Sequence, residues 1–234
     1  MTTVAEKLTI INGALGDIKT AIEGKGVTPS GDITTYATAI GNISGGGSSG
    51  KYQLLDRVKD DSNNEIGTVS GFFTDANNNE YAVVCLDAQY RLGSGEYLSV
   101  NAAVSGIPNY QNQSVWGATE TATTNTTAIL ATGTTSACTH CRSKSFTIDS
   151  VTYAGQLPTL KELVDIFGHR TAINTQDTSA GQYSALVIPT NNTAWSSSQY
   201  GTNEAWLLSN EGEVLYADKD GTGIIIPVLE LPNA

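Results

Sequence analysis

Apolar residues near the start of the chain recur at helical spacing. The seam of an a/d heptad is formed by positions separated by steps of four and three, namely Val4, Leu8, Ile11, Leu15, Ile18 and Ile22. A second helix is predicted from about Asp32, a suitable N-cap, to Ile43. One short amphipathic helix cannot bury its apolar stripe alone. The pattern therefore predicts either an intramolecular helical hairpin or a self-association module, and it leaves both open.

The segment 45–50, Gly-Gly-Gly-Ser-Ser-Gly, contains no side chain that can join a core. Such a composition is typical of a flexible linker. We therefore predict a helical attachment or oligomerisation module at 1–44, a linker at 45–50 and the main domain at 51–234.

The pattern then changes to strands. Strands are predicted for Tyr52–Val58, Ile66–Phe73 and Tyr81–Leu86, with Asn- and Asp-rich turns at 60–65 and 75–80. Phe146–Tyr153 reads as a hairpin around Asp149-Ser150. The second turn imitates a calcium-binding loop, but its sixth position is Glu80 instead of Gly, so calcium is not expected there.

The middle of the chain is less regular. Residues 90–116 are rich in Gly, Ser, Asn and Gln and are predicted to be a long surface excursion, ending near Trp116. A helix is expected at Thr119–Leu130. A clearer helix spans 157–167, where Thr159 and Glu162 form a capping box, and its apolar face contains Leu160, Leu163, Val164 and Phe167. His169-Arg170 is expected at the C-terminal end of this helix.

Composition narrows the choice of partners. Of 234 residues only 15% are charged, and the net charge is −11, from 12 Lys and Arg against 23 Asp and Glu. Lys and Arg form no patch, which argues against nucleic acid. No stretch of 18 apolar residues and no export signal is found, so we expect a soluble protein without membrane insertion. Three cysteines favour synthesis in a reducing cytoplasm.

Cys138-Thr-His-Cys141 is the motif most suggestive of chemistry, because two thiols at this spacing can form a redox pair or half of a zinc site. Zinc needs two further ligands, for which only His140, His169 and the distant Cys85 are candidates. A structural role is favoured over metal binding and redox catalysis. Since no Gly-x-Ser-x-Gly, dinucleotide or Walker motif is present, we expect a protein that is not an enzyme and has no cofactor.

The C-terminal stretch Trp195–Leu229 alternates residues suited to burial with Tyr, Ser, Asn and Asp. This composition is typical of recognition surfaces. Trp195 and Trp206 are predicted to be buried, and Tyr200 and Tyr216 to be exposed.

The succession Leu157-Pro-Thr-x-x-Glu-Leu163, Trp195-Ser-Ser-Ser198, Ala205-Trp206 and Pro227-Val228-Leu229 resembles C-type-lectin-fold domains of the formylglycine-generating-enzyme-like type. That group includes variable proteins of diversity-generating retroelements and ligand-binding tips of some tailed-phage fibres. Residues 4–44 resemble the N-terminal region of many phage tail proteins. The resemblance implies an α+β fold with small antiparallel sheets, two flanking helices and a loop-rich face.

The resemblance also implies a division of the C-terminal segment. The scaffold would consist of Trp195, Ser196, Ser197, Trp206, Pro227 and Val228. The exposed, variable, ligand-binding set would consist of Tyr200, Thr202, Asn203, Glu204, Asn210, Glu213, Tyr216, Asp218, Asp220 and Thr222. Calcium and sugar motifs of true lectins are absent, so no metal is implied.

These expectations combine into a non-catalytic receptor-binding protein of a tailed phage or prophage, diversified by a retroelement. It would lie in the virion at a tail or fibre tip, as a homotrimer joined through its N-terminal helices. Its partners would be other tail proteins and a host cell-surface protein or glycan. Two alternatives stay open, a structural head or tail decoration protein and a thiol- or zinc-dependent enzyme at Cys138 and Cys141.

Overall fold

The chain divides into two compact units, Met1–Gln53 and Leu54–Ala234, and each is described by itself. The structure is a computed structural model that describes Leu15, Ile18, Lys19, residues 50–92, Tyr97, and residues 103–111, 120–133, 135–180 and 193–233. In the first unit Leu15, Ile18 and Lys19 are helical. The rest of the two predicted N-terminal helices lies outside the described residues.

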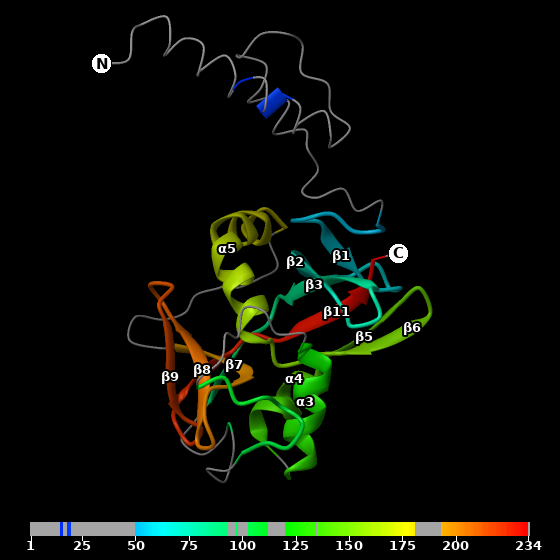
Figure 1. The fold of residues 1–234 in the computed structure, drawn as a ribbon. Helices are drawn as coiled ribbons and strands as arrows, with labels where there is room; N and C mark the ends of the chain where they lie inside the picture. Colours follow the sequence, from blue (N-terminus) through cyan, green and yellow to red (C-terminus); the bar gives the residue numbers. More distant parts are fainter. Residues whose placement is uncertain are drawn as a thin grey trace, which may run out of the picture. The chain divides into compact units, whose positions relative to one another are not determined.

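The second unit is an α+β, loop-rich structure with small, mainly antiparallel sheets, as the sequence predicts, but its described residues form three helices where two were expected (Figure 1). One sheet has the order β1 (Arg57–Lys59), β2 (Glu65–Thr74), β3 (Glu80–Leu86), β11 (Val228–Pro232). The other has the order β4 (Tyr90–Leu92), β10 (Gly223–Ile225), β7 (Thr193–Gln199), β8 (Glu204–Ser209), β9 (Val214–Asp218). A separate hairpin consists of β5 (Ser145–Ile148) and β6 (Val151–Ala154).

Strand β3 confirms the strand predicted from the apolar run Tyr81–Leu86. It lies between β2 and β11, and its residues from Ala82 to Leu86 are all buried. A strand covered on both faces is apolar throughout, which explains the uninterrupted run in the sequence. The prediction for Tyr52–Val58 is wrong at its start, because β1 begins only at Arg57 and Leu55 occupies a turn with φ 69°.

The hairpin turns are organised by aspartates, as predicted for 60–65 and 75–80. Asp60 Oδ1 accepts hydrogen bonds from the backbone N–H of Ser62 (3.0 Å) and of Asn64 (2.8 Å). Asp75 repeats this arrangement in the next hairpin. Hydrogen bonds from the Asn64 side chain and backbone hold the pKa of Asp60 below its ordinary value. The hairpin of β5 and β6 is confirmed as well, since Asp149 and Ser150 adopt the positive φ values, 51° and 65°, of a tight turn.

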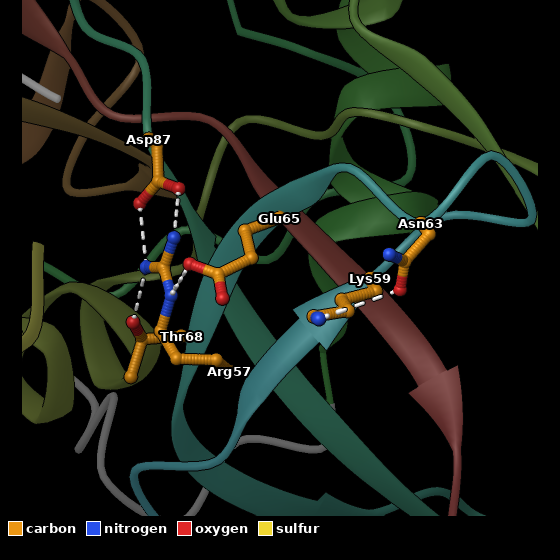
Figure 2. Close-up of polar contacts among 6 residues, drawn as sticks. All are labelled: Arg57, Lys59, Asn63, Glu65, Thr68 and Asp87. Carbon is orange, nitrogen blue, oxygen red and sulfur yellow. Dashed lines mark hydrogen bonds and ion pairs between the residues drawn. The ribbon is translucent and has the colours of Figure 1, made fainter. Parts of the chain in front are cut away.

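An ion pair joins β1 to the segment that follows β3 (Figure 2). The Arg57 guanidinium donates to both carboxylate oxygens of Asp87, at 2.9 and 2.5 Å, and to Thr68 Oγ1 at 2.8 Å. Its Nε donates to Glu65 at 3.3 Å. The Asp87 side chain is only 4% exposed. This two-pronged geometry fixes the edge strand β1, which has only three residues, against the rest of its sheet.

The three helices are α3 (Ala122–Ala131), α4 (Ser136–Ser143) and α5 (Leu160–Ala180). The capping box of α5 is confirmed, because Thr159 N donates to Glu162 Oε2 (2.6 Å) and Glu162 N donates to Thr159 Oγ1 (3.3 Å). The predicted end near His169 is wrong, since the buried Ile173 continues the apolar face and the helix runs on to Ala180. In the described part of the chain no helix has both the length and the apolar character needed to cross a bilayer.

Among the described residues, each face of the five-stranded sheet is covered by a large core cluster. Helix α5 contacts both large sheets, and its residues Leu163 and Ile166 pack with Val83 of β3 and Leu208 of β8. On the opposite face Trp195 packs with α3, α4 and several residues from the segment after β4.

The prediction that 90–116 is a surface excursion is wrong in its described parts. Tyr90–Leu92 forms β4, and Tyr97, Val104, Ile107 and Tyr110 are buried. The Tyr97 ring lies 4.7 Å from that of Trp195, and its hydroxyl donates to Ser196 O at 2.7 Å. A few apolar residues spaced among Gly, Ser and Asn are therefore enough to cover one face of the sheet. Trp116 lies outside the described residues.

Candidate binding surface on the five-stranded sheet

The candidate surface is built on β7, β8 and β9, which follow one another in sequence and pair in the same order at one side of the sheet (Figure 1). Strand β9 is the edge strand of this sheet. In the β8–β9 register Glu204 lies opposite Asp218, Trp206 opposite Tyr216 and Leu208 opposite Val214. Because side chains alternate along a strand, these three pairs share one face.

Three aromatic rings gather on that face. Tyr200 stacks on Tyr216 with ring centroids 3.9 Å apart and an interplanar angle of 13°. Trp206 meets Tyr200 edge-on at 4.8 Å and Tyr216 at 6.0 Å. We call Tyr200, Trp206 and Tyr216 the aromatic cluster. Its outer member is open to solvent, since Tyr216 is 53% exposed.

The inner side of the cluster is tied to the core. Trp206 is half-buried and packs against the buried residues Tyr110 and Leu160 and the half-buried Val164. The prediction that Trp206 is a core residue is therefore correct only for part of its ring. The prediction of an exposed Tyr216 is confirmed, whereas Tyr200 is half-exposed. The sheet thus presents an aromatic surface supported from behind by α5.

The structure brings most of the ten predicted ligand-binding residues to one end of the sheet, where the β7–β8 and β9–β10 connections meet. This end contains Tyr200, Thr202, Asn203, Glu204, Asp218, Asp220 and Thr222. Tyr216 lies in the middle of β9, whereas Asn210 and Glu213 lie in the β8–β9 turn at the other end. Half-buried members of the set are Tyr200, Glu204 and Asn210, and the others are exposed.

Sequence reasoning missed the residue that holds the main end together, Lys219. Its side chain is buried, and its Nζ donates to Gln199 Oε1 (2.6 Å), Thr202 O (2.9 Å) and Gly201 O (3.4 Å). Its backbone N–H donates to Asn203 O at 2.9 Å. Burial lowers the pKa of Lys219 to about 8, and the nearby Glu204 carboxylate opposes this shift. The buried Lys219 side chain therefore holds the β7–β8 turn through the backbone oxygens of Gly201 and Thr202.

No local signal identifies Lys219. It stands between Asp218 and Asp220 in a polar run, where a lysine is ordinarily solvated. Its burial becomes intelligible only once the carbonyl groups of the neighbouring turn converge on its ammonium group. The partner Gln199 is equally inconspicuous in the sequence.

Gln199 connects this end of the sheet to the segment 104–110. Its Oε1 also accepts from Val104 N (2.8 Å), and its Nε2 donates to Ile107 O (3.3 Å). Its backbone oxygen accepts from Tyr110 N at 3.2 Å. Gln199 is itself buried. The turn, the β9–β10 connection and the segment behind the aromatic cluster therefore form one hydrogen-bonded unit.

The predicted scaffold serine tract has its polar groups satisfied internally. Ser196 Oγ donates to Trp206 O (2.7 Å), and Ser198 Oγ accepts from Leu160 N at the start of α5 (2.9 Å). Ser198 Oγ also donates to the Glu120 carboxylate. Loss of hydration raises the pKa of Glu120, although its hydrogen-bond donors oppose the shift. Trp195, Ser196, Ser197, Pro227 and Val228 are all buried.

The exposed part of the surface is acidic. Glu204 and Asp218 are directly opposite each other on β8 and β9, an arrangement in which like charges repel. Glu211 and Glu213 flank the start of β9, and Asp220 follows its end. The carboxylates thus surround the aromatic cluster with negative potential, which favours ligands that carry positive charge.

The cysteine motif lies elsewhere, in α4 on the opposite face of the sheet. Cys138 and Cys141 are both buried in the cluster around Trp195 and form no disulfide. Burial raises the pKa of the Cys138 thiol to about 12 and also raises that of Cys141. Since the thiolate is the nucleophile and the metal ligand, this environment opposes both chemistries. Cys85 packs in the other cluster, and no group of three or more potential metal ligands occurs among the described residues.

His169 and Arg170 lie in the middle of α5 instead of at its end. His169 Nδ1 is 2.9 Å from Asp165 O, one turn earlier in the helix. Arg170 donates to Asn210 O (2.9 Å), and its guanidinium lies 4.0 Å from the centre of the Phe167 ring. Arg170 therefore holds the β8–β9 turn against α5 through the backbone oxygen of Asn210.

A pocket of about 350 Å³ lies apart from this surface, between the β2–β3 hairpin and the start of α3. The stacked rings of Phe73 and Tyr81 and the Glu230 carboxylate contribute to its lining. None of the ten predicted ligand-binding residues lines it. The predicted site is thus an exposed sheet surface and not part of this pocket.

Comparison of the chain with models of known protein families, with curated proteins and with solved structures finds no match.

Proposed function

We propose that this protein is a non-catalytic receptor-binding protein of a tailed phage or prophage, and that its second unit has a C-type lectin fold of the formylglycine-generating-enzyme-like type. The observation that carries the proposal is the aromatic cluster, in which Tyr216 is 53% exposed beside Tyr200 and Trp206. Exposed aromatic residues on a well-packed support are the usual centres of protein recognition. The buried network below them contributes to positioning and leaves the outward side chains available for a ligand.

The separation of outward and inward residues supports diversification by a retroelement. Five of the six scaffold residues, Trp195, Ser196, Ser197, Pro227 and Val228, are buried and Trp206 is half-buried, whereas no member of the ligand-binding set is fully buried. Substitutions in the outward set leave the apolar core intact. A near-repeat of the codons for residues 195–230, differing only at adenines and lying beside a reverse transcriptase gene, is the expected genomic signature.

Attachment and multiplicity are proposed for the N-terminal unit. Its heptad seam suits a homotrimer that joins other tail proteins at the fibre tip. Several copies of a surface with modest affinity bind a cell much more tightly than one copy. Sedimentation of the full chain is expected to give the mass of a trimer, and a stable monomer would contradict this part of the proposal.

Removal of two rings tests the proposal. The double substitution Tyr200→Ala with Tyr216→Ala is expected to weaken binding to host cells at least about tenfold, because aromatic residues at the centre of an interface contribute on the order of 1–2 kcal/mol each. Melting temperature should change little, since Tyr216 is largely exposed. Val151→Ala is the matched control, because Val151 is 50% exposed on the separate β5–β6 hairpin.

The same assay separates a receptor-binding protein from a structural decoration. Particles that carry a chain without residues 54–234 are expected to assemble and fail to adsorb. Failure of assembly would instead favour a structural role. The burial of Cys138 and Cys141 gives the thiol- or zinc-dependent alternative no support.

A further inference from the structure

Strand β9 is the edge strand of the five-stranded sheet, beside the aromatic cluster. Among the residues that the structure describes, no strand pairs with the outer side of β9. Leu215 is 40% and Tyr216 53% exposed, and these neighbours point to opposite faces of the sheet. An edge strand with large apolar side chains on both faces is a template for pairing with another chain.

The hydrogen-bond pattern shows which backbone groups face outward. Ser209 N donates to Glu213 O and Lys219 N donates to Asn203 O, each at 2.9 Å, which marks hydrogen-bonded pairs at both ends of the β8–β9 ladder. Such pairs alternate along an antiparallel ladder. Leu215 and Ala217 therefore bond to β8.

The remaining residues of β9 fall in the alternate positions. The backbone N–H groups that point to the outer edge belong to Val214, Tyr216 and Asp218. The Asp218 carbonyl is already used, since it accepts from Gly221 N at 2.9 Å. An added strand would therefore bond to the N–H and C=O groups of Val214 and Tyr216 and to Asp218 N.

The acidic residues around β9 indicate what kind of strand can pair with its outer edge. Acidic residues flank both ends of β9: Glu211 and Glu213 precede it, Asp218 is its last residue, and Asp220 follows two positions later. Antiparallel self-pairing centred on Tyr216 would gather the acidic ends of two β9 strands in one ladder, with Val214 of one copy opposite Asp218 of the other. Repulsion disfavours that arrangement, the more so because the chain carries a net charge of −11. A strand with basic residues at its ends is complementary instead.

We propose that β9 accepts an extended, basic segment of the ligand protein as an additional strand. This inference rests on the proposed receptor-binding function and deepens it, because it assigns a polypeptide ligand instead of a glycan. Backbone hydrogen bonds would supply affinity, and side chains beside Tyr216 and Leu215 would supply selectivity. A Lys or Arg of the ligand beside Tyr216 would gain both a carboxylate and an aromatic face.

Amide exchange of the ¹⁵N-labelled full chain provides the test. The probe is a synthetic heptapeptide with Lys at both ends and alternating Val and Thr between them. At a peptide concentration about nine times its Kd, exchange of the amides of Val214, Tyr216 and Asp218 should slow about tenfold. The same peptide N-methylated at alternate amides should give no protection, since it lacks the donors for the ladder.

Three outcomes would overturn the inference. One is unchanged exchange at these amides with the Lys-ended peptide at millimolar concentration. Another is equal protection by a peptide with Glu at both ends. The third is protection without peptide that increases with protein concentration, because it would show that a second copy occupies the edge.

Substitutions of the flanking acids test the charge argument. Glu213→Gln with Asp218→Asn is expected to weaken binding of the Lys-ended peptide about fivefold, because two exposed charge pairs are lost. The control Ser145→Lys with Val151→Lys changes net charge by the same amount on the β5–β6 hairpin and should leave affinity within about twofold. If both variants weaken peptide binding equally, the loss of affinity comes from the change in net charge and not from Glu213 and Asp218, which would contradict the proposed charge complementarity.

Host-cell binding keeps this inference separate from the proposed function. Cells that bind the chain through Tyr200 and Tyr216 while β9 gains no protection from the Lys-ended peptide would refute strand addition and leave the receptor-binding function standing. Protection by the peptide with no binding to any host cell would support strand addition and refute the receptor-binding function.

Discussion

Two cationic side chains, Arg57 and Lys219, fix connections against the two large sheets, and they do so with different partners. Arg57 donates to the carboxylate of Asp87, with Glu65 also in contact (Figure 2). Lys219 donates to the neutral oxygens of Gln199, Thr202 and Gly201. Both side chains are largely removed from water, and Arg57 forms an ion pair with Asp87.

The two sets of partners support different parts of the molecule: Arg57 holds an edge strand of the four-stranded sheet, and Lys219 holds a turn of the candidate binding surface. A guanidinium paired with two carboxylate oxygens is held in one geometry, which suits the short edge strand β1. The Lys219 ammonium group is buried with hydrogen bonds to neutral oxygens, and this burial lowers its pKa although the Glu204 carboxylate opposes the shift. The turn that carries Thr202 and Asn203 therefore rests on a weaker, pH-sensitive support than the framework does.

The largest effect is expected in the framework. Asp87→Ala leaves the Arg57 guanidinium, whose side chain is 15% exposed, without its main partner and should destabilise the fold by about 3 kcal/mol. In a unit of this size the melting temperature would decrease by roughly 6–12 °C. Asp87→Asn keeps one acceptor and should cost less. A loss below about 1 kcal/mol in urea unfolding would show that the ion pair is not important for stability.

A smaller effect is expected at Lys219. Lys219→Met keeps the apolar stem and leaves the oxygens of Gln199, Thr202 and Gly201 without this donor, which costs about 1–2 kcal/mol. Relief of the buried ammonium group offsets part of that cost. Lys219→Gln, which retains a donor, is the control. Urea unfolding that shows Lys219→Met to be more destabilising than Asp87→Ala would reverse the comparison.

The smallest effect is a pH dependence specific to Lys219. Its pKa in the folded chain is about 8, below the unfolded value of 10.5. Between these values the unfolded chain binds more protons, so stability should increase as pH rises from about 8 to 10.5. The measurement is the free energy of unfolding across that range for the wild type and Lys219→Met. An identical slope in the variant would assign the effect to other groups.

Segments with a strong local pattern were predictable. Strand β3 is an uninterrupted apolar run because both of its faces are covered. The β5–β6 hairpin follows from Asp149 and Ser150, which tolerate positive φ. The start of α5 follows from the Thr159–Glu162 capping box, whose two hydrogen bonds are local. In each case the determinants lie within a few residues of the element they define.

Features that depend on distant partners were not predictable. Tyr97 and Ile107 lie in a polar stretch and are buried only because Trp195 and the sheet stand opposite. The end of α5 depends on Ile173, whose contacts come from other strands. Lys219 is buried because a turn in the preceding hairpin directs its carbonyl groups inward. None of these relations leaves a periodic signal in the sequence.

The candidate site combines features that the local sequence predicts with features that depend on distant partners. Tyr216 on the edge strand β9 is exposed as predicted, and Ser196 and Ser197 are buried as the scaffold assignment implies. The stacking of Tyr200 on Tyr216 depends on the β8–β9 register and on the turn held by Lys219. The composition therefore indicated a recognition surface, whereas the selection of Trp206 as its half-buried support required the fold.

Photo-crosslinking tests the central claim, that the aromatic cluster contacts the ligand, most directly. A photoreactive phenylalanine derivative is placed at Tyr216 in the full chain, and in a second preparation at Val151, which is similarly exposed. On illumination with host cells, the account predicts a discrete crosslinked product from position 216 and none from position 151. Cells that bind both preparations but yield no product from position 216, or equal products from both positions, would contradict it.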